Sequence, residues 1–253
     1  MKNLSYLLLL ALPLTFSCGS KTEEKSELLT EGATEITPSD DPAAELKYAV
    51  CIWDKASVKE EATAKGKWLA SMNLGEKATF LDDEKEDEAG KKTYVKVKLL
   101  DGKEGWVQKD FIVTKGRPAA ILNDVDFYNR PDLMAKSNKQ FSKMDVVGVE
   151  AIEGDWVKVA GKRKGGTWID KGYVKKDNLT YDEKDIAVAV FGAKALAVTD
   201  RAKRDAEINK IVANKDLEGS VFINDLRSAL TPVITETNDA VPATVDSAAV
   251  PAQ

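Results

Sequence analysis

The feature of this chain that most restricts its fold is an internal repeat. Residues 94–112 align with residues 156–179: each segment begins with aromatic-Val-Lys-Val and continues to Gly, an aromatic residue, Val and Lys-Asp. Apolar and polar residues alternate in both copies, which predicts β-strands with one buried face. The Asp101-Gly102 pair predicts a hairpin turn. The repeat therefore indicates two related β-structures in one chain.

Residues upstream of each copy extend the similarity. The segment 74–81 parallels 144–149, so each copy becomes a set of short strands separated by turns that contain Gly and Asp. Strands at this spacing, over about 60–65 residues, favour a small β-barrel or a packed pair of small sheets.

The repeated pattern resembles the bacterial SH3-like fold, in which an aromatic strand, a tight turn and a Gly-aromatic-Val strand follow one another. In the second copy, Val-Asp-Phe-Tyr-Asn-Arg-Pro at 125–131 is similar to the family's early aliphatic, Asn, Val, Arg and Pro segment, in altered order. The first copy departs from the family, because Ile-Trp-Asp-Lys at 52–55 leads into a polar stretch instead. The resemblance covers about residues 46–181.

This resemblance implies two small SH3-like β-barrels in tandem, at 46–115 and 116–181. It also implies a platform that binds peptidoglycan peptides or another envelope protein and has no catalytic residues. The candidate groove residues are Tyr128, Trp156 and Tyr173 in the second copy, with Trp53 and Trp106 in the first. The alternative is that these aromatic side chains fill the cores, since small barrels bury their aromatic residues.

The carboxyl-terminal part of the chain has a helical pattern. Asp182 to Asp185 form an acidic helix start, and an apolar, Ala-rich run follows at 186–198. Ile208, Ile211 and Val212 form an apolar stripe at helical spacing. We expect helices over 182–230 that pack on the barrels or on another subunit, and a disordered tail at 231–253.

The amino terminus predicts export and lipid attachment. Residues 1–17 contain Lys2 and a short Leu-rich core, typical of a signal peptide and too short to span a bilayer. The small residue Ser17 directly before Cys18 resembles a lipoprotein lipobox of the looser spirochaete type. Cys18 would then carry fatty acids such as palmitate, and two or three acyl chains make a stable membrane anchor. The alternative is an ordinary cleaved signal with an incidental cysteine.

Residues 18–45 are predicted to be a disordered acidic tether. The part at 19–45 carries eight acidic residues against two lysines and has no apolar periodicity. Beyond this tether lies Cys51, inside an apolar strand-like run, where a buried and inert thiol is expected.

The composition excludes several classes of enzyme. The chain has 253 residues with no His and 2 Cys. A Ser-His-Asp or Cys-His site and most zinc sites therefore cannot form, so we expect no catalytic residues, metal or cofactor. The charges nearly balance, with 37 basic and 42 acidic residues, so nucleic acid is not an expected partner.

Two charged segments flank the repeated strands. Acidic residues dominate 82–88, before the first copy's aromatic strand, and Lys-Arg-Lys occupies 162–164 in the second copy. They are interpreted as solvated hairpin tips. The alternatives are that they steer a charged partner, that they hold the two modules together and, for the acidic segment, that it binds Ca²⁺ weakly.

The sequence therefore predicts a lipid-anchored binding or scaffolding protein of the cell envelope, on the periplasmic face or the outer surface of the outer membrane. A surface lipoprotein that contacts host molecules is a second hypothesis. An envelope hydrolase that uses carboxylates or a Ser/Lys pair is a third.

Overall fold

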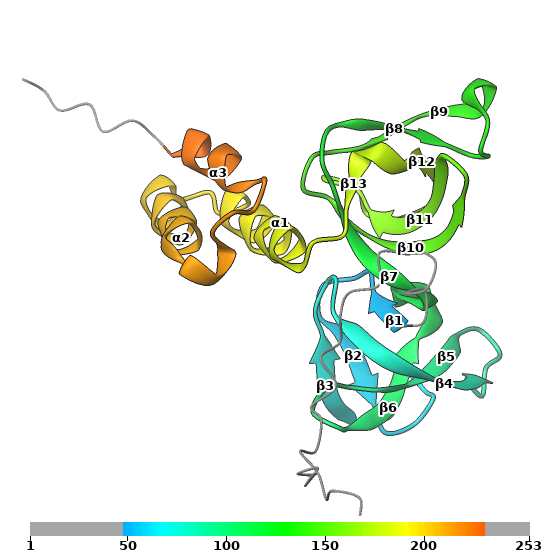
Figure 1. The fold of residues 1–253 in the computed structure, drawn as a ribbon. Coiled ribbons are helices and arrows are strands. Elements are labelled where there is room, and N and C mark those ends of the chain that lie inside the picture. The colour runs from blue at the N-terminus through cyan, green and yellow to red at the C-terminus, as the bar shows by residue number, and fades with distance from the viewer. Residues whose placement is uncertain (1–47, 231–253) are drawn as a thin grey trace, which may run out of the picture. The chain divides into compact units, whose positions relative to one another are not determined.

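The computed structural model describes residues 48–230 and consists of β-strands followed by helices (Figure 1). The amino-terminal strands are β1 (Tyr48–Cys51), β2 (Ala56–Lys59), β3 (Trp68–Met72), β4 (Lys77–Glu86), β5 (Thr93–Lys98) and β6 (Glu104–Gln108). The later strands are β7 (Ile112–Ile121), β8 (Val125–Tyr128), β9 (Lys136–Phe141), β10 (Val146–Glu153), β11 (Trp156–Lys162), β12 (Ile169–Lys175) and β13 (Leu179–Thr180).

Short 3-10 helices connect several strands, and three α-helices end the described part of the chain. The 3-10 helices are η2 (Lys109–Phe111), η3 (Leu133–Ala135), η4 (Lys176–Asn178) and η5 (Lys215–Leu217). The α-helices are α1 (Glu183–Leu196), α2 (Arg201–Ala213) and α3 (Ile223–Ala229).

The expectation of two separate SH3-like barrels in tandem is wrong. The strands form one open antiparallel sheet of 13 strands in the order β3-β2-β6-β5-β4-β1-β7-β10-β11-β12-β8-β9, with β13 also paired to β7. Strands β3 and β9 lie at the two ends of this order, so the pairing does not close on itself.

The long strand β7 makes the sheet continuous. Its beginning pairs with β1, where Ile112 lies opposite Cys51, and its end pairs with β10, where Ala120 lies opposite Val146. Figure 1 shows β7 continuing from one group of strands into the other. The boundary expected between residues 115 and 116 falls inside this strand, where the register with β1 shifts between Val113 and Gly116 but the strand continues.

Both copies of the repeat form the same succession of elements: a hairpin, a 3-10 helix and a following strand. In the first copy these are β5, β6, η2 and β7, and in the second they are β11, β12, η4 and β13. The repeated glycine has a packing reason in each copy. A Cβ atom on Gly105 would lie 2.8 Å from the Lys59 carbonyl oxygen, and one on Gly172 would lie 2.5 Å from the Tyr128 carbonyl oxygen. A neighbouring strand therefore approaches too closely for any larger residue.

Separate apolar clusters lie along the sheet. One is formed by β1–β6 and the start of β7, and includes Cys51, Met72 and Val97. A second is formed by β7–β13 and includes Phe127 and Phe141. A small cluster of Val50, Ile52, Val113 and Ala160 joins the two groups of strands. Burial of these side chains therefore connects the strands on either side of β7.

The helices predicted from the sequence are present: α1 packs on β7 and β10, α2 packs on α1, and α3 packs on α2. Asp182 caps α1 by accepting hydrogen bonds from the backbone N–H groups of Lys184 and Asp185 at 2.7 and 3.3 Å. The helices share an apolar cluster with Ala120, Met144 and Val146 from the strand region. The helices were expected to pack either on the strands of the same chain or on another subunit. In the structure, α1 packs on strands of the same chain.

A buried carboxylate fixes α1 to its surroundings. Asp185 is buried and accepts hydrogen bonds from the Thr180 hydroxyl at 2.7 Å and the Val221 backbone N–H at 2.9 Å. The carboxylate thus links the last strand, α1 and the segment before α3.

Cys18, the predicted signal at 1–17, the tether at 18–45 and the tail at 231–253 lie outside the described residues. Within residues 48–230, no helix is long and apolar enough to cross a bilayer. Cys51 is fully buried, as expected, and burial raises the pKa of its thiol to about 11.

Candidate functional site

Three of the five predicted groove residues lie together on one face of the sheet. Tyr128 is on β8, Trp156 begins β11 and Tyr173 is on β12. The Tyr128 and Trp156 rings meet edge to face, with centroids 4.8 Å apart. Tyr173 lies directly opposite Tyr128 in the strand register, so the two side chains share a face. We call Tyr128, Trp156 and Tyr173 the aromatic patch.

Strand alternation explains why these rings lie outside the core. Val157, Val159 and Val174 point to the other face, where they are fully buried in the apolar cluster of β7–β13. Trp156 and Tyr173 point to the face opposite these valines. Both are half-buried, whereas Tyr128 on the same face is only 9% exposed. Tyr128 therefore forms the base of the patch, and the other two rings offer accessible surface.

Positive charge lies directly on the patch. The Lys175 ammonium is 3.9 Å from the centre of the Trp156 ring, a cation–π contact between residues that pair in the register. Lys158 pairs with Tyr173, so its side chain is on the same face. The hydrogen bond from Lys158 to Glu150 raises the pKa of this lysine, which keeps it protonated at neutral pH.

Negative charge is available beside the same rings. The Tyr173 hydroxyl donates to the Glu153 carboxylate at 3.3 Å. Glu150 forms ion pairs with Lys158 at 3.1 Å and with Lys171 at 3.3 Å. The patch thus combines ring faces with charges of both signs, which suits a ligand that carries carboxylate and ammonium groups.

Trp106 occupies the position in the first repeat that Tyr173 occupies in the second, but it is covered. Its ring is 6% exposed, and the Lys85 ammonium lies 4.7 Å from the ring centre. Tyr94, which aligns with Trp156, is 3% exposed, and burial raises the pKa of its hydroxyl. Tyr94 was absent from the candidate residues, although its alignment with Trp156 would have identified it.

Trp53 lies elsewhere. Its ring stacks on Phe111 with centroids 5.1 Å apart, and the Lys162 ammonium is 4.8 Å from its centre. In residues 48–230 no ring contact joins Trp53 or Trp106 to the aromatic patch. A ligand-binding role for these two tryptophans stays a prediction.

Sequence reasoning also missed the two most exposed tryptophans. Trp68 on β3 is 61% exposed, and Trp168, just before β12, is 80% exposed. Both follow polar or glycine-rich residues, and the strand pattern alone did not distinguish them from core residues.

The charged segments expected at hairpin tips differ from each other in structure. The acidic segment extends along β4, where Asp82 and Glu84 form ion pairs with Lys115 and Lys109 at 3.2 and 2.6 Å. Within the described residues, no group of three or more Asp, Glu, Cys or His side chains is arranged to hold a metal ion. The basic segment begins the loop between β11 and β12.

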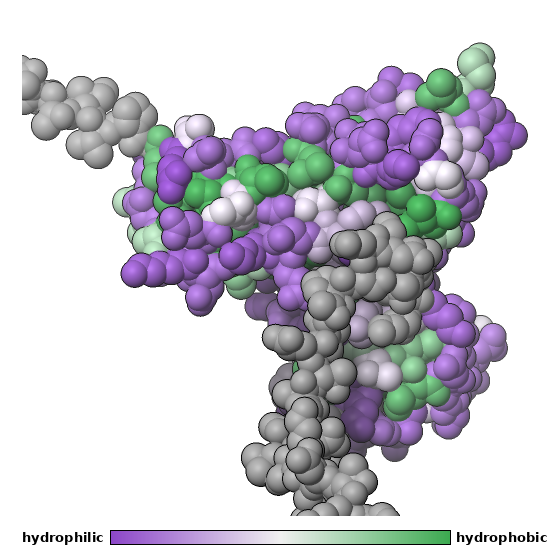
Figure 2. Space-filling model, in the orientation of Figure 1, coloured by the Kyte–Doolittle hydropathy of each residue, from purple (hydrophilic) through white to green (hydrophobic). Residues whose placement is uncertain are grey.

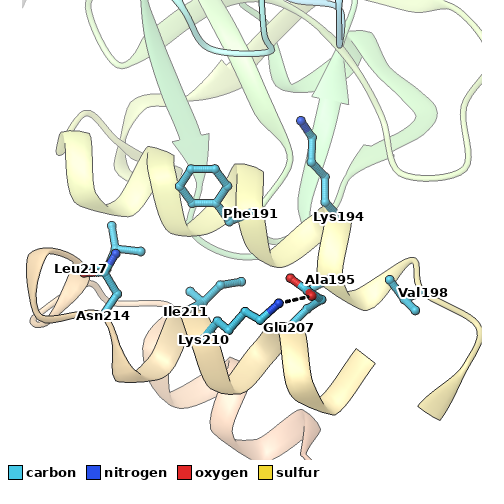
Figure 3. A pocket seen from close by; sticks show the side chains of 9 residues that line it. All are labelled: Phe191, Lys194, Ala195, Val198, Glu207, Lys210, Ile211, Asn214 and Leu217. Atoms are coloured by element: carbon cyan, nitrogen blue, oxygen red, sulfur yellow. Dashed lines mark hydrogen bonds and ion pairs between the residues drawn. The ribbon is translucent and has the colours of Figure 1, made fainter. Parts of the chain in front are cut away.

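A groove of about 430 Å³ lies between α1, α2 and η5 (Figure 3). Apolar side chains line most of it, and Glu207 and Lys210 form an ion pair on α2 at 2.6 Å. Its lining residues are Phe191, Lys194, Ala195, Val198, Glu207, Lys210, Ile211, Asn214 and Leu217. Lys194 pairs with Asp54 at 2.8 Å, so its charge is already balanced.

Comparisons with known proteins add little to this geometry. No protein-family model matches the chain, and no curated protein matches it. Among solved structures, similarity is found to NlpC2 and NlpC1 from Trichomonas vaginalis, each at 14% identity and a TM-score of 0.23 over 65% of this chain. The match spans only 55% and 52% of those proteins. At this TM-score the similarity carries no argument about function.

Proposed function

We propose that this chain is a non-catalytic binding protein of the cell envelope, anchored through lipid on Cys18, which binds short peptides at the aromatic patch. The observation that carries the proposal is the cluster of Tyr128, Trp156 and Tyr173 with Lys175 on one sheet face. Half-buried rings next to fixed charges are typical of ligand-binding surfaces.

The charges around the patch define the ligand class. Lys175 and Lys158 are placed to meet a carboxylate, while Glu153 and Glu150 are placed to meet an ammonium group. The stem peptides of peptidoglycan carry both groups and are short enough for a patch of three rings. We therefore favour these peptides over a folded protein partner as the ligand.

The same contacts support binding rather than catalysis. A nucleophile or general base needs a pKa near the working pH, and the raised pKa of Lys158 moves this amine away from that range. The chain also lacks His, so the usual general base is absent from its sequence.

The binding test uses the full-length chain with Cys18→Ser, which cannot receive lipid. Retention on purified peptidoglycan and affinity for soluble stem peptides would be measured for this protein and for a Trp156→Ala variant. We expect the variant to bind about tenfold more weakly, because the ring supplies both the flat surface and the support for Lys175.

Trp68→Ala is the matched control, because it removes another exposed indole from β3. We expect its binding to equal that of the parent chain. Equal loss in both variants, or no retention of the parent chain, would contradict the proposal.

The anchor is tested separately by mass spectrometry of the mature protein. A first residue at position 18 that carries acyl groups is the expected result. An unmodified thiol at that position would contradict the lipid anchor and leave the peptide site to be judged on its own.

A further inference from the structure

We propose that two hairpin loops at one end of the sheet form a surface that binds anionic phospholipid bilayers. The first loop joins β11 to β12 (residues 163–168), and the second joins β8 to β9 (residues 129–135). We call them the lipid loops. This surface is distinct from the aromatic patch and does not depend on the lipid at Cys18.

The strand register places the lipid loops at the same end of the sheet. Strand β12 is antiparallel to β8, with Tyr173 opposite Tyr128. The loop that precedes β12 and the loop that follows β8 therefore leave the sheet on the same side. Asp170 links the first loop to the strand that follows the second loop, since its carboxylate pairs with Arg163 of the first loop at 2.5 Å and with Lys139 of β9.

The lipid loops carry large apolar side chains that are mostly exposed. Trp168 is 80% exposed and Met134 is 90% exposed, and Leu133 beside it is also exposed. Figure 2 shows hydrophobic surface at the outer end of the β8–β9 hairpin, surrounded by hydrophilic residues. Isolated exposed side chains are common, but a Trp and a Leu-Met pair on adjacent loops form a group.

The surroundings of these side chains are basic. The stretch 162–168 reads Lys-Arg-Lys-Gly-Gly-Thr-Trp and contains no acidic residue. Arg130 lies in the second loop, whose acid Asp132 accepts a hydrogen bond from the Met134 backbone N–H at 2.9 Å. The acid between the loops, Asp170, is neutralised by Arg163 and Lys139.

Hydrogen bonds hold the first loop in shape. The Lys164 backbone N–H donates to the Asp145 carboxylate at 3.1 Å, and the Gly166 N–H donates to the Arg163 carbonyl at 2.9 Å. Gly165 has a φ of 71°, which a glycine adopts without strain. Trp168 is thus presented on an ordered turn, so little conformational entropy is lost when it binds.

This combination fits a bilayer surface. Indole rings partition to the level of the lipid headgroups, and Lys and Arg side chains reach phosphates while their stems contact apolar surface. Each basic side chain near an anionic leaflet adds to the attraction. Two narrow loops offer a few inserting side chains rather than the broad, flat area of a protein interface.

The experiment measures contact between Trp168 and lipid directly. The full-length Cys18→Ser chain is mixed with vesicles of brominated phosphatidylglycerol, and bromine quenching of tryptophan emission is recorded. We expect quenching that disappears in Trp168→Phe and persists in Trp68→Phe, where the other highly exposed indole is removed. Vesicles of brominated phosphatidylcholine should give little quenching.

Charge is tested with Lys164→Glu, which leaves the indole in place. We expect the lipid concentration for half-maximal quenching to rise about fivefold or more, since the reversal removes a favourable charge near the leaflet. Lys98→Glu, at the exposed last residue of β5, is the matched control and should change nothing.

The proposal is overturned if quenching is equal in the parent chain and Trp168→Phe, or if neutral and anionic vesicles quench alike. It is also overturned if Lys98→Glu weakens binding as much as Lys164→Glu. These outcomes are independent of peptidoglycan binding, because Trp168 lies outside the aromatic patch.

Discussion

The two repeats place aromatic residues at matching positions, yet only the second leaves them accessible. Tyr94 and Trp106 are buried, whereas Trp156 and Tyr173 are half-buried. The difference comes from the hairpins that precede them. Strand β10 ends at Glu153, directly opposite Trp156, so only a two-residue turn lies next to the aromatic patch. A short turn thus leaves the rings uncovered.

In the first repeat the preceding hairpin is longer and distorted. The pairing of β4 with β5 shifts between Phe80 and Glu84, and Asp82 in this stretch has a φ of 53°. Such a bulge bends the strand. Lys85 beyond the bulge pairs with Tyr94 and lies over Trp106. Both preceding hairpins contain a register shift, so the difference between the copies lies in the longer β4–β5 hairpin, which brings Lys85 over Trp106.

The largest expected effect is a difference in the free energy of unfolding between variants of Trp106 and Trp156. Trp106→Ala should lower the free energy of unfolding by about 3–5 kcal/mol, because a buried indole leaves a cavity. Trp156→Ala should lower it by about 1–2 kcal/mol, since less area is buried. Urea denaturation of the full chain measures both values, and equal losses would show that the two sites are buried alike.

The second largest effect is expected at the glycine that both repeats share, Gly105 in the first and Gly172 in the second. Gly172→Ala should lower the free energy of unfolding by about 2–3 kcal/mol, because the new Cβ would meet the Phe127 ring at 2.3 Å and the Tyr128 carbonyl at 2.5 Å. Gly105→Ala should cost less, because its closest contact is a Val58 methyl group at 2.6 Å.

Gly154→Ala is the control for these glycine variants. It meets no atom within 4 Å and has a φ of 62°, so only the backbone strain of about 1 kcal/mol should appear. A larger loss at Gly154 than at Gly172 would mean that strand proximity does not explain the repeated glycine.

The hairpin of β11 and β12 should make the stability of the fold sensitive to acid, through Asp170. Burial raises the pKa of Asp170, but hydrogen bonds from Lys139 and Arg163 outweigh this effect and leave the pKa below its usual value. A carboxyl whose pKa is lower in the folded than in the unfolded state stabilises the fold at pH values above its unfolded-state pKa. This stabilisation is lost as the pH falls through its folded-state pKa. Asp170→Asn should therefore cost about 1–2 kcal/mol at pH 7 and progressively less below about pH 4.

An exposed aspartate in the hairpin loop of the first repeat, Asp101, provides the contrast. The hydrogen bond from Lys103 lowers the pKa of Asp101, but this pair, at 2.7 Å, is exposed and screened by solvent, so Asp101→Asn should change the unfolding free energy and its pH dependence much less than Asp170→Asn. Denaturation curves between pH 2 and 7 compare the two variants. A cost for Asp170→Asn that stays constant with pH would exclude the ion pairs as its cause.

The smallest expected effect concerns the lysines over the tryptophans. Lys175→Met should lower the free energy of unfolding by about 0.5–1 kcal/mol through loss of the cation–π contact with Trp156. Lys85→Met should cost less, because its ammonium is farther from the Trp106 ring, at 4.7 Å against 3.9 Å. A double-mutant cycle with Trp156→Leu isolates the contact, and zero coupling would show that Lys175 acts through solvation alone.

Local features were predictable from the sequence. The alternation in both repeats, the Asp101-Gly102 turn and the acidic start of α1 all appear in the structure, because strands, turns and helix caps depend on neighbouring residues. Tyr128, Trp156 and Tyr173 were named as candidate groove residues through the resemblance of the second copy to a known pattern, and the structure places them on one sheet face. The roles of these rings and of Cys18 stay predictions.

The tertiary structure decided what depends on distant strands. Whether the sheet closes into barrels or continues through β7 is a matter of hydrogen bonding between β1, β7 and β10, which lie far apart in the chain. Whether an aromatic ring is buried depends on side chains of other strands, as for Trp106, over which Lys85 of β4 lies. Residue type specifies which face of a strand a side chain occupies, but the elements that cover that face are determined only when the chain folds.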